Sequence, residues 1–301
     1  METTNRQIKE LSILIPVYNQ VCVDKIEILK KLCDNINTLT YEIIVADDGS
    51  NNSYDVNQNE RINKLEHCSF VVKPTNTGAA DTRNFLADRS HYSRLLFLDC
   101  DMDIPDNDFI RRYLVHNEEA VVNGGIKIGG NYNDMKSNLR YIYEYDAEPK
   151  HTAKERTNRP YKEFRSTNFM IPREIMLACR FDNRFKRYED VYFGKMLKQN
   201  GIKIIHIDNP TVMNDFENNT DYIYKVEKDL HTLNQFRKEL HGYSQMLTFT
   251  DTLQHRMPLC LIKLWHKLFG NIERSNLTSN HPNLKVFNIY RLGYYISIRN
   301  N

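Results

Sequence analysis

Short apolar segments alternate with amphipathic helical patterns in the N-terminal third of this chain, and this alternation restricts the fold more than any other feature of the sequence. The expected strands, rich in β-branched and aromatic residues, span residues 11–16, 41–46, 68–72 and 94–98. Helices are expected over residues 24–39 and 78–89. Strands and helices in this order form a mainly parallel sheet with helices on its faces, so the predicted fold class is α/β.

A polar loop directly follows three of the expected strands. These loops are residues 16–19, 47–50 and 99–103. In open parallel sheets, ligands bind beyond the carboxyl ends of the strands. We therefore expect the three loops to meet at one edge of the sheet and to form a binding site there.

The third loop carries Asp99, Asp101 and Asp103 at alternate positions after an apolar strand. Ionised carboxylates this close repel one another, and a hard divalent cation would relieve the repulsion. In proteins, Mg²⁺ or Mn²⁺ commonly lies between one or two carboxylates and the phosphates of a substrate. The loop thus indicates a site for Mn²⁺ or Mg²⁺ with a diphosphate, and the alternative is a solvated acidic loop.

The middle of the chain is less regular. A strand is expected over residues 121–128, and the pair Gly124-Gly125 inside it indicates a bulge or a close approach to a ligand. The polar stretch 144–163 is predicted to be a mobile loop over the site.

Helical patterns dominate the rest of the chain. We expect a helix at residues 189–200 that ends at Gly201, and a strand at 203–207. A long helix then carries one apolar face, formed by Ile223, Val226, Leu230, Leu233, Phe236 and Leu240. We accordingly predict one domain over residues 1–217 and a C-terminal helical extension over residues 218–301.

Residues 257–269 are strongly apolar, include Trp265, and carry Lys263, His266 and Lys267 among the apolar residues. Such a segment resembles an amphipathic helix that lies on a membrane surface. The alternative is a helix that packs in the core or against a partner.

Composition narrows the class of protein. The formal net charge is +2, which argues against nucleic acid as the main partner. The 6 cysteines show no Cys-x-x-Cys spacing, so we expect no structural zinc and a reducing compartment. Because the sequence has neither an apolar signal segment nor an apolar run of about 18 residues, we expect a cytoplasmic protein, at the inner face of the membrane if residues 257–269 contact it.

The motifs at the strand ends and helix starts resemble those of the family 2 glycosyltransferases, which have the GT-A fold. The matching residues are 12–19, 43–50, Asn76-Thr77-Gly78, Arg83-Asn84, 97–101, Thr167-Asn168, Arg173 and Glu189-Asp190. The resemblance implies an inverting transfer of a sugar from a nucleotide-sugar donor. It also implies a nucleotide-binding half over about residues 1–105 and an acceptor half over about residues 106–217.

The resemblance assigns roles around the nucleoside. Asp48 would accept a hydrogen bond from the imide N–H of uracil, and Pro16 and Tyr18 would line the base pocket. Asp47 would either brace its loop or meet the ribose. The alternative for residues 47–50 is a plain turn.

The diphosphate and the metal are assigned in the same way. Asn76 and Arg83 would bring a helix N-terminus and a cation to the diphosphate, unless Arg83 is an exposed helix residue. Asp101 would be the principal metal ligand, and Asp99 would lie nearer the ribose or the water shell of the metal. Asp103 would either share the metal or cap a turn.

Two positions depart from the pattern of the family. Many members carry an acidic residue directly after the second Asp, where this chain has Met102. The family also often supplies a His after the next strand, but residues 212–215 contain none, and Asp215 or His206 would have to take its place.

Glu189 and Asp190 resemble the acidic pair of the family at a helix start. In an inverting transfer, Asp190 would be the general base that deprotonates the acceptor hydroxyl, and Glu189 would bind acceptor hydroxyls. The alternative is a pair of acidic residues that only stabilises the start of a helix.

These assignments predict a hexosyl- or N-acetylhexosaminyl-transferase with a UDP-sugar as donor. The expected acceptor is a glycan or lipid-linked glycan in bacterial surface polysaccharide synthesis, and a homo-oligomer is compatible with the sequence. One alternative is a nucleotidyltransferase that makes nucleotide sugars, but it should carry a Gly-rich basic loop that residues 16–20 do not supply. The other is a non-catalytic domain that binds nucleotide sugars, against which Asp101 and Asp190 argue.

Overall fold

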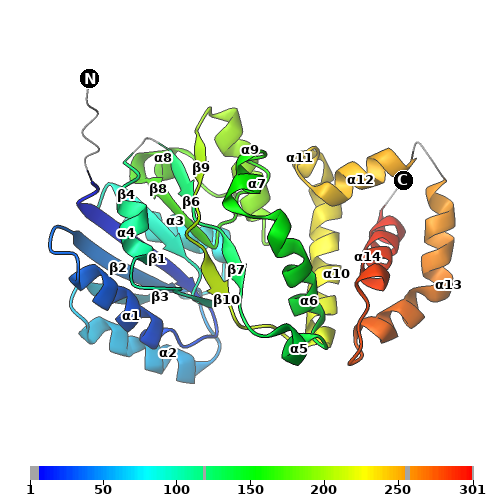
Figure 1. Ribbon diagram of the computed structural model, residues 1–301, viewed down its shortest axis with the longest axis horizontal. Coiled ribbons are helices and arrows are strands. Elements are labelled where there is room, and N and C mark those ends of the chain that lie inside the picture. Colours follow the sequence, from blue (N-terminus) through cyan, green and yellow to red (C-terminus); the bar gives the residue numbers. More distant parts are fainter. Residues whose placement is uncertain (1–6, 118–119, 255–257, 300–301) are drawn as a thin grey trace. The chain divides into compact units, whose positions relative to one another are not determined.

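The structure is a computed structural model that describes residues 7–117, 120–254 and 258–299. It contains a seven-stranded sheet in the order β3-β2-β1-β4-β8-β6-β9 (Figure 1). The strands are β1 Glu10–Val17, β2 Thr40–Asp47, β3 Cys68–Val72, β4 Arg94–Leu98, β6 Val121–Asn123, β8 Asn168–Pro172 and β9 Ile204–His206. The strands β1 to β4 run parallel, as do β6 and β9, whereas β8 is antiparallel to both β4 and β6.

Both faces of this sheet are buried, which is why its strands read as continuous apolar runs. Successive side chains of a strand point to opposite faces, so the odd and even positions of β1 enter different cores. Ile13 and Ile15 pack on one face with the helices α1 Val23–Asp34 and α4 Phe109–Leu114. Leu14 packs on the other face with α3 Ala79–Arg89, α8 Arg173–Ala178 and α9 Glu189–Gln199.

The first predicted helix is shorter than its pattern. It ends at Asp34, although Ile36 and Leu39 continue the helical spacing. Both side chains still reach the core that α1 covers, but they do so from the turn that leads into β2. Apolar spacing thus marked the buried side chains correctly and the end of the helix incorrectly.

The strand expected over residues 121–128 is two strands in two sheets. The chain leaves β6 at Asn123 and, after Gly124-Gly125, enters β7 Ile126–Ile128. The strand β7 lies in a three-stranded sheet of order β5-β10-β7, with β5 Met102–Asp103 and β10 Thr211–Met213.

Close contacts within the protein and the backbone conformation require glycine at both positions of this crossing. A Cβ on Gly124 would lie 2.4 Å from the Asn209 carbonyl oxygen and 2.4 Å from the Tyr113 hydroxyl, and Gly125 has a φ of +89°. The close approach expected to a ligand is therefore an approach to other parts of the protein.

The mobile loop predicted at residues 144–163 is a largely helical segment. It contains the end of α6 Leu139–Ala147, the short helix η2 Glu148–Lys150 and α7 Ala153–Thr157. Arg156 is buried and donates to the carbonyl oxygens of Asn123 (3.1 Å), Gly124 (3.0 Å) and Ile207 (2.8 Å). The polar composition of this stretch suggested an exposed loop. The prediction failed because Arg156 is buried and donates hydrogen bonds to backbone carbonyl groups where the chain passes from β6 to β7.

The chain divides into two compact units. The first consists of the described residues of Met1–Lys127 and His151–Met213 and holds the seven-stranded sheet, together with α2 Ser53–Asn59 and η1 Glu60–Lys64. The second consists of those of Ile128–Lys150 and Asn214–Asn301 and is helical. The domain boundary at residue 217 stays a prediction.

Besides α6 and η2, the described residues of the second unit form the helices α5 Tyr132–Met135, α10 Asn219–Gln235, α11 Arg237–Leu240, α12 Gln245–Gln254, α13 Leu259–Leu277 and α14 Leu284–Ile298. The predicted apolar face of the long helix is buried, with a break at Phe236 between α10 and α11. Met257, the first residue of the predicted amphipathic segment, lies outside the described residues. Within those residues, no helix is both long enough and apolar enough to cross a bilayer.

Arg156→Met tests the role of the buried arginine. It leaves several buried carbonyl groups without a donor, so we expect the free energy of unfolding in urea to fall by about 3 kcal/mol or more. Lys154→Met is the matched control, because Lys154 is an exposed cation of the same helix and its loss should change stability by about 0.5 kcal/mol or less. Equal effects of the two substitutions would contradict the structural role of Arg156.

Candidate active site

The three polar loops meet at one edge of the sheet, as predicted. Val17 and Asp47 are direct partners in the parallel ladder of β1 and β2, and β4 continues the sheet on the other side of β1. Two of the loops are tied together, because Asn19 N–H donates to Ser50 Oγ at 2.7 Å and Asn51 N–H donates to Asn19 Oδ1 at 3.0 Å. The carboxyl ends of the strands therefore form one polar surface.

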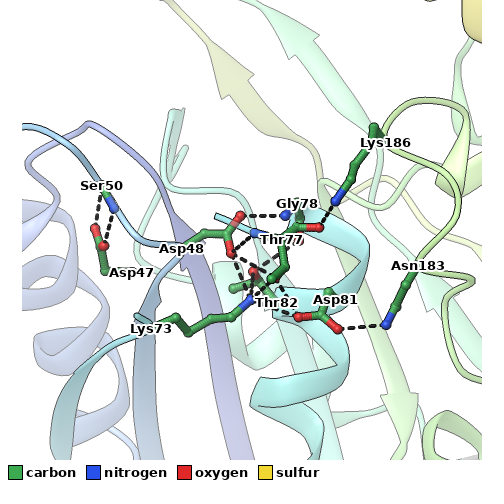
Figure 2. Close-up of polar contacts among 10 residues, drawn as sticks. All are labelled: Asp47, Asp48, Ser50, Lys73, Thr77, Gly78, Asp81, Thr82, Asn183 and Lys186. Carbon is green, nitrogen blue, oxygen red and sulfur yellow. Dashed lines mark hydrogen bonds and ion pairs between the residues drawn. The ribbon is translucent and has the colours of Figure 1, made fainter. Parts of the chain in front are cut away.

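Asp48 is buried at this edge and is held by an unusually complete set of donors (Figure 2). Its Oδ1 accepts from Lys73 Nζ at 2.8 Å and from the Thr77 amide at 3.0 Å, and its Oδ2 accepts from the Gly78 amide at 2.7 Å. Burial alone would raise the pKa of this carboxyl, but the hydrogen bonds from Lys73, Thr77 and Gly78 outweigh it and lower the pKa. Asp48 is thus an ionised acceptor at the N-terminus of α3.

Lys73 belongs to this candidate site, and the sequence analysis did not name it. Its side chain is 5% exposed, and its Nζ also lies 2.9 Å from Asp81 Oδ2 and 3.0 Å from Thr82 Oγ1. It directly follows β3, so a basic residue at the carboxyl end of a fourth parallel strand was the available signal. Because Lys73 bonds to β2 and α3 together, it fixes the loop that carries Asp48.

Two residues of the segment before α9 also bond to the start of α3. Lys186 Nζ donates to the Thr77 carbonyl oxygen, and Asn183 Nδ2 donates to Asp81 Oδ1 at 2.7 Å (Figure 2). The amides of Thr77 and Gly78, just before α3, donate to Asp48. Asn76, the preceding residue, is exposed.

Asp47 braces its own loop. Its carboxylate accepts from the Ser50 amide at 2.7 Å and from the Ser50 hydroxyl at 2.5 Å. Gly49 has a φ of +67°, and a Cβ there would lie 2.5 Å from the Thr75 carbonyl carbon, so the turn requires glycine. Beside this turn, Pro16 is partly buried and Tyr18 is exposed.

Arg83 is buried and joins the two acidic groups that the sequence singled out. Its NH2 donates to Asp99 Oδ1 at 2.7 Å, and its NH1 donates to Glu189 Oε1 at 3.3 Å. The exposed-helix alternative for Arg83 is therefore wrong, since its side chain is 3% exposed. One guanidinium thus connects the loop after β4 with the start of α9.

This network crowds carboxylates around a single cation. Burial and the charge of Asp101 raise the pKa of Asp99 to about 6, against the lowering effect of Arg83. Burial and the charge of Asp190 likewise raise the pKa of Glu189, again against Arg83. Near neutral pH, the site can therefore hold a proton between these groups or take up a cation.

Asp101 and Asp103 have different surroundings. Asp101 is exposed on a turn that is closed by the Met102 amide donating to the Asp99 carbonyl oxygen at 3.3 Å. Asp103 forms an ion pair with Lys25 at 3.1 Å. Met102 is buried on β5, which explains why this position carries no acid, since its side chain points into the core.

His206 does not replace the histidine that the pattern lacks. Its Nδ1 lies 2.9 Å from Arg156 NH1 and its Nε2 lies 2.9 Å from the Pro160 carbonyl oxygen, so both ring nitrogens are engaged. Burial, together with the charge of Arg156, lowers the pKa of His206 to about 4. The part of the chain that the structure describes contains no group of three or more His, Cys, Asp and Glu side chains placed to hold a metal ion by themselves. Asp215, the other substitute considered, lies in the second unit.

Glu189 and Asp190 form the first turn of α9, as expected. Asp190 Oδ1 accepts from the Val191 amide at 2.7 Å, and its Oδ2 lies 3.8 Å from Arg165 NH1. The residue before them, Tyr188, has a φ of 62°, an uncommon left-handed conformation for a tyrosine. The turn at Tyr188 sets where the two carboxylates project.

Known proteins are similar in sequence to this region. A family model described as glycosyl transferase family 2 matches residues 12–180 of the 301-residue chain. An uncharacterized glycosyltransferase from Haemophilus influenzae is 27% identical over 191 residues, which is 63% of this chain and 72% of that protein.

Solved structures share the fold at low sequence identity. TarS 1–349 from S. aureus superimposes with a TM-score of 0.51 at 16% identity, over 96% of this chain and 90% of that one, and its complex with UDP-GlcNAc gives 0.52 at 16% identity, over the same shares. The mannosyltransferase PcManGT from Pyrobaculum calidifontis, in complex with GDP-Man and Mn²⁺, gives 0.53 at 12% identity, over 95% of this chain and 84% of that one. The expected α/β architecture of the GT-A type is confirmed.

Removal of the Lys73 ammonium tests the set of hydrogen bonds that Asp48 accepts from Lys73, Thr77 and Gly78, here called the Asp48 cradle. Lys73→Met leaves a buried carboxylate without its cation, so we expect the free energy of unfolding to fall by about 3 to 5 kcal/mol. The double variant Lys73→Met/Asp48→Asn should lose clearly less than the sum of the single variants, because neither charge remains unpaired. Lys64→Met, at an exposed position, is the control; additive losses in urea titrations would contradict the pairing.

Proposed function

Because this chain belongs to glycosyl transferase family 2, we propose that it is an inverting glycosyltransferase that moves a sugar from a UDP-sugar to a glycan or lipid-linked glycan acceptor. That it is a glycosyltransferase follows from the family and from its glycosyltransferase relative. These matches do not support the nucleotidyltransferase or the non-catalytic domain. The observation that carries the finer proposal is Arg83, which brings the donor loop at Asp99 and the carboxylates at Glu189 into one network.

The donor side of the proposal rests on Asp48. A carboxylate offers about four lone-pair sites, and Oδ2 of Asp48 accepts from the Gly78 amide, which leaves capacity for the imide N–H of uracil. Pro16 and Tyr18 would flank the base, and Asp47 would hold the turn on which Asp48 lies. The TarS and PcManGT complexes contain UDP-GlcNAc and GDP-Man, and both uracil and guanine carry a ring N–H that such a carboxylate could accept.

The remaining donor residues would act on the sugar and the diphosphate. Asn76 is exposed beside the Asp48 cradle and would meet the diphosphate. Asp99 would meet the ribose or the water shell of the metal, and Arg83 would act through Asp99, whose carboxylate it orients.

The residues present fit a divalent metal that binds together with its substrate. Mg²⁺ and Mn²⁺ need only one or two protein carboxylates when phosphate oxygens complete their coordination. Asp101 is exposed at the strand end and would be that ligand, and Asp103 would share the ion only by giving up part of its pairing with Lys25. With such an ion bound, the negative charge on the departing nucleoside diphosphate would be neutralised.

The transfer itself needs a base on the acceptor side. Asp190 would accept the proton of the acceptor hydroxyl while that oxygen bonds to the anomeric carbon and the diphosphate leaves from the opposite face. Asp190 lies in the first turn of α9, where the Val191 amide donates to its Oδ1 and orients the carboxylate. Glu189, fixed by Arg83, would bind acceptor hydroxyls.

Asp190→Asn tests the base. With Mn²⁺ and a panel of UDP-sugars and GDP-mannose, we expect release of nucleoside diphosphate to fall by about 10²- to 10⁴-fold, while the dissociation constant for UDP stays unchanged. Glu174→Gln, an exposed acid on α8, should retain the wild-type rate. Turnover of the Asp190→Asn enzyme at the wild-type rate would remove Asp190 from this role.

Chelation tests the metal. We expect EDTA to weaken calorimetric UDP binding by about tenfold or more, which corresponds to about 1.4 kcal/mol. Asp101→Asn should abolish the effect of Mn²⁺, whereas Asp103→Asn should keep most of it because Asp103 is already paired with Lys25. UDP affinity that is the same in EDTA and Mn²⁺ would show that the nucleotide binds without a metal.

A further inference from the structure

The helix α13 carries an exposed apolar surface that neither the sheet nor the candidate site uses. Six large side chains on one side of this helix are between 38% and 67% exposed. They are Leu261, Leu264, Trp265, Leu268, Phe269 and Ile272, here called the α13 stripe. Their spacing of three and four residues places them along one side of the helix.

The exposure of the stripe is not a failure of α13 to pack, because a different face of the helix is buried. Gly270, Glu273 and Leu277 are buried, and α13 lies against α14 (Figure 1). Arg274 Nε of α13 donates to Glu227 Oε1 of α10 at 3.0 Å. The core alternative for this segment is therefore wrong for the stripe itself, which points away from the packed face.

Tight approach to α14 confirms which face is packed. A Cβ on Gly293 of α14 would lie 2.9 Å from the Cβ of His266, and a Cβ on Gly270 would lie 2.9 Å from the ring of His266. The indole N–H of Trp265 donates to Glu273 Oε1 at 2.8 Å, which holds the ring at the border between the packed face and the stripe. The orientation of the stripe is thus set by the second unit alone.

The exposed charges of this part of α13 are positive and lie mainly on the side away from the stripe. Residues 258–272 contain Lys263 and Lys267, both exposed, and no Asp or Glu; the next residue, Glu273, is buried. At about 100° per residue, Lys263 lies nearly opposite the middle of the stripe, and Lys267 borders it three residues after Leu264. A helix with Trp, Phe and Leu on one face and lysines on its polar face is typical of one that lies in the plane of a lipid interface. The Lys267 side chain can extend to phosphate groups while its methylene stem stays against apolar atoms.

We propose that the α13 stripe binds the surface of a bilayer that contains anionic phospholipids, with α13 lying in the plane of the membrane. The helix enters only the interface, since no helix within residues 7–117, 120–254 and 258–299 can span a bilayer. A second copy of the chain is the other candidate occupant, and the experiments below distinguish it from a membrane.

Trp265 is the only tryptophan of the sequence and lies in the stripe, so tryptophan fluorescence reports directly on the stripe. Full-length protein is titrated with vesicles of phosphatidylcholine alone and of phosphatidylcholine with phosphatidylglycerol. We expect a blue shift of the emission and protection from acrylamide with the anionic vesicles, and binding weaker by about tenfold or more without phosphatidylglycerol, as two lysines near a charged surface imply.

Variants separate the two parts of the surface. Leu264→Ser/Leu268→Ser should remove the blue shift with either vesicle, whereas Lys263→Glu/Lys267→Glu should remove the preference for phosphatidylglycerol. Ile28→Ser/Tyr54→Ser, at exposed apolar positions of α1 and α2, should bind as the wild type does. All variants change exposed side chains, and their circular dichroism should match that of the wild type.

Three results would overturn the proposal. The first is emission that anionic vesicles leave unchanged in the wild-type protein. The second is undiminished binding by natively folded Leu264→Ser/Leu268→Ser. The third is a blue shift that appears in lipid-free buffer as protein concentration rises, together with a dimer mass by light scattering, which would assign the stripe to a second copy. Since the vesicles contain neither nucleotide nor acceptor, these outcomes are independent of the proposed transferase reaction.

Discussion

Asp48 and Lys73 form a buried ion pair at the point where the strands β1, β2 and β3 end together. Asp48 follows β2 and its amide donates to Val17 of β1, while Lys73 follows β3 and bonds to the first turn of α3. A charge in this position is tolerated because it is paired and hydrogen-bonded. The pair therefore makes the geometry of the candidate nucleotide pocket a property of the fold, which exists before a ligand arrives.

Arg83 does for the second half of the site what Lys73 does for the first. Its guanidinium spans from Asp99 to Glu189, which are far apart in the sequence and belong to the two sides of the proposed reaction. Burial and repulsion among the carboxylates raise the pKa of both Asp99 and Glu189, although Arg83 lowers it. A cluster of this kind can take up positive charge, as the proposed metal and acceptor chemistry requires.

The sequence predicted the sheet well where its strands are buried on both faces, and less well where contacts distant in the chain decide the structure. The first four strands are short, continuous apolar runs, which fit strands that are buried on both faces of a sheet. All four appear where they were expected. The stretch 144–163 reads as a loop because it is polar, yet Arg156 turns inward to satisfy carbonyl groups at the β6–β7 crossing. In the sequence, His206 is a candidate metal ligand. In the structure, its two ring nitrogens lie within hydrogen-bond distance of the Arg156 guanidinium and the Pro160 carbonyl oxygen.

The sequence by itself determined the α/β class, the family and the grouping of acidic loops at one edge of the sheet. These follow from local patterns, since a parallel strand order places successive strand ends together whatever the later contacts are. Only the tertiary structure decided that Lys73 belongs to the site, that Arg83 is buried between two carboxylates, that Met102 points into the core, and that α13 leaves an apolar stripe uncovered. Burial and pairing depend on residues that are distant in the chain, and a local pattern carries no record of which side chain will meet which partner.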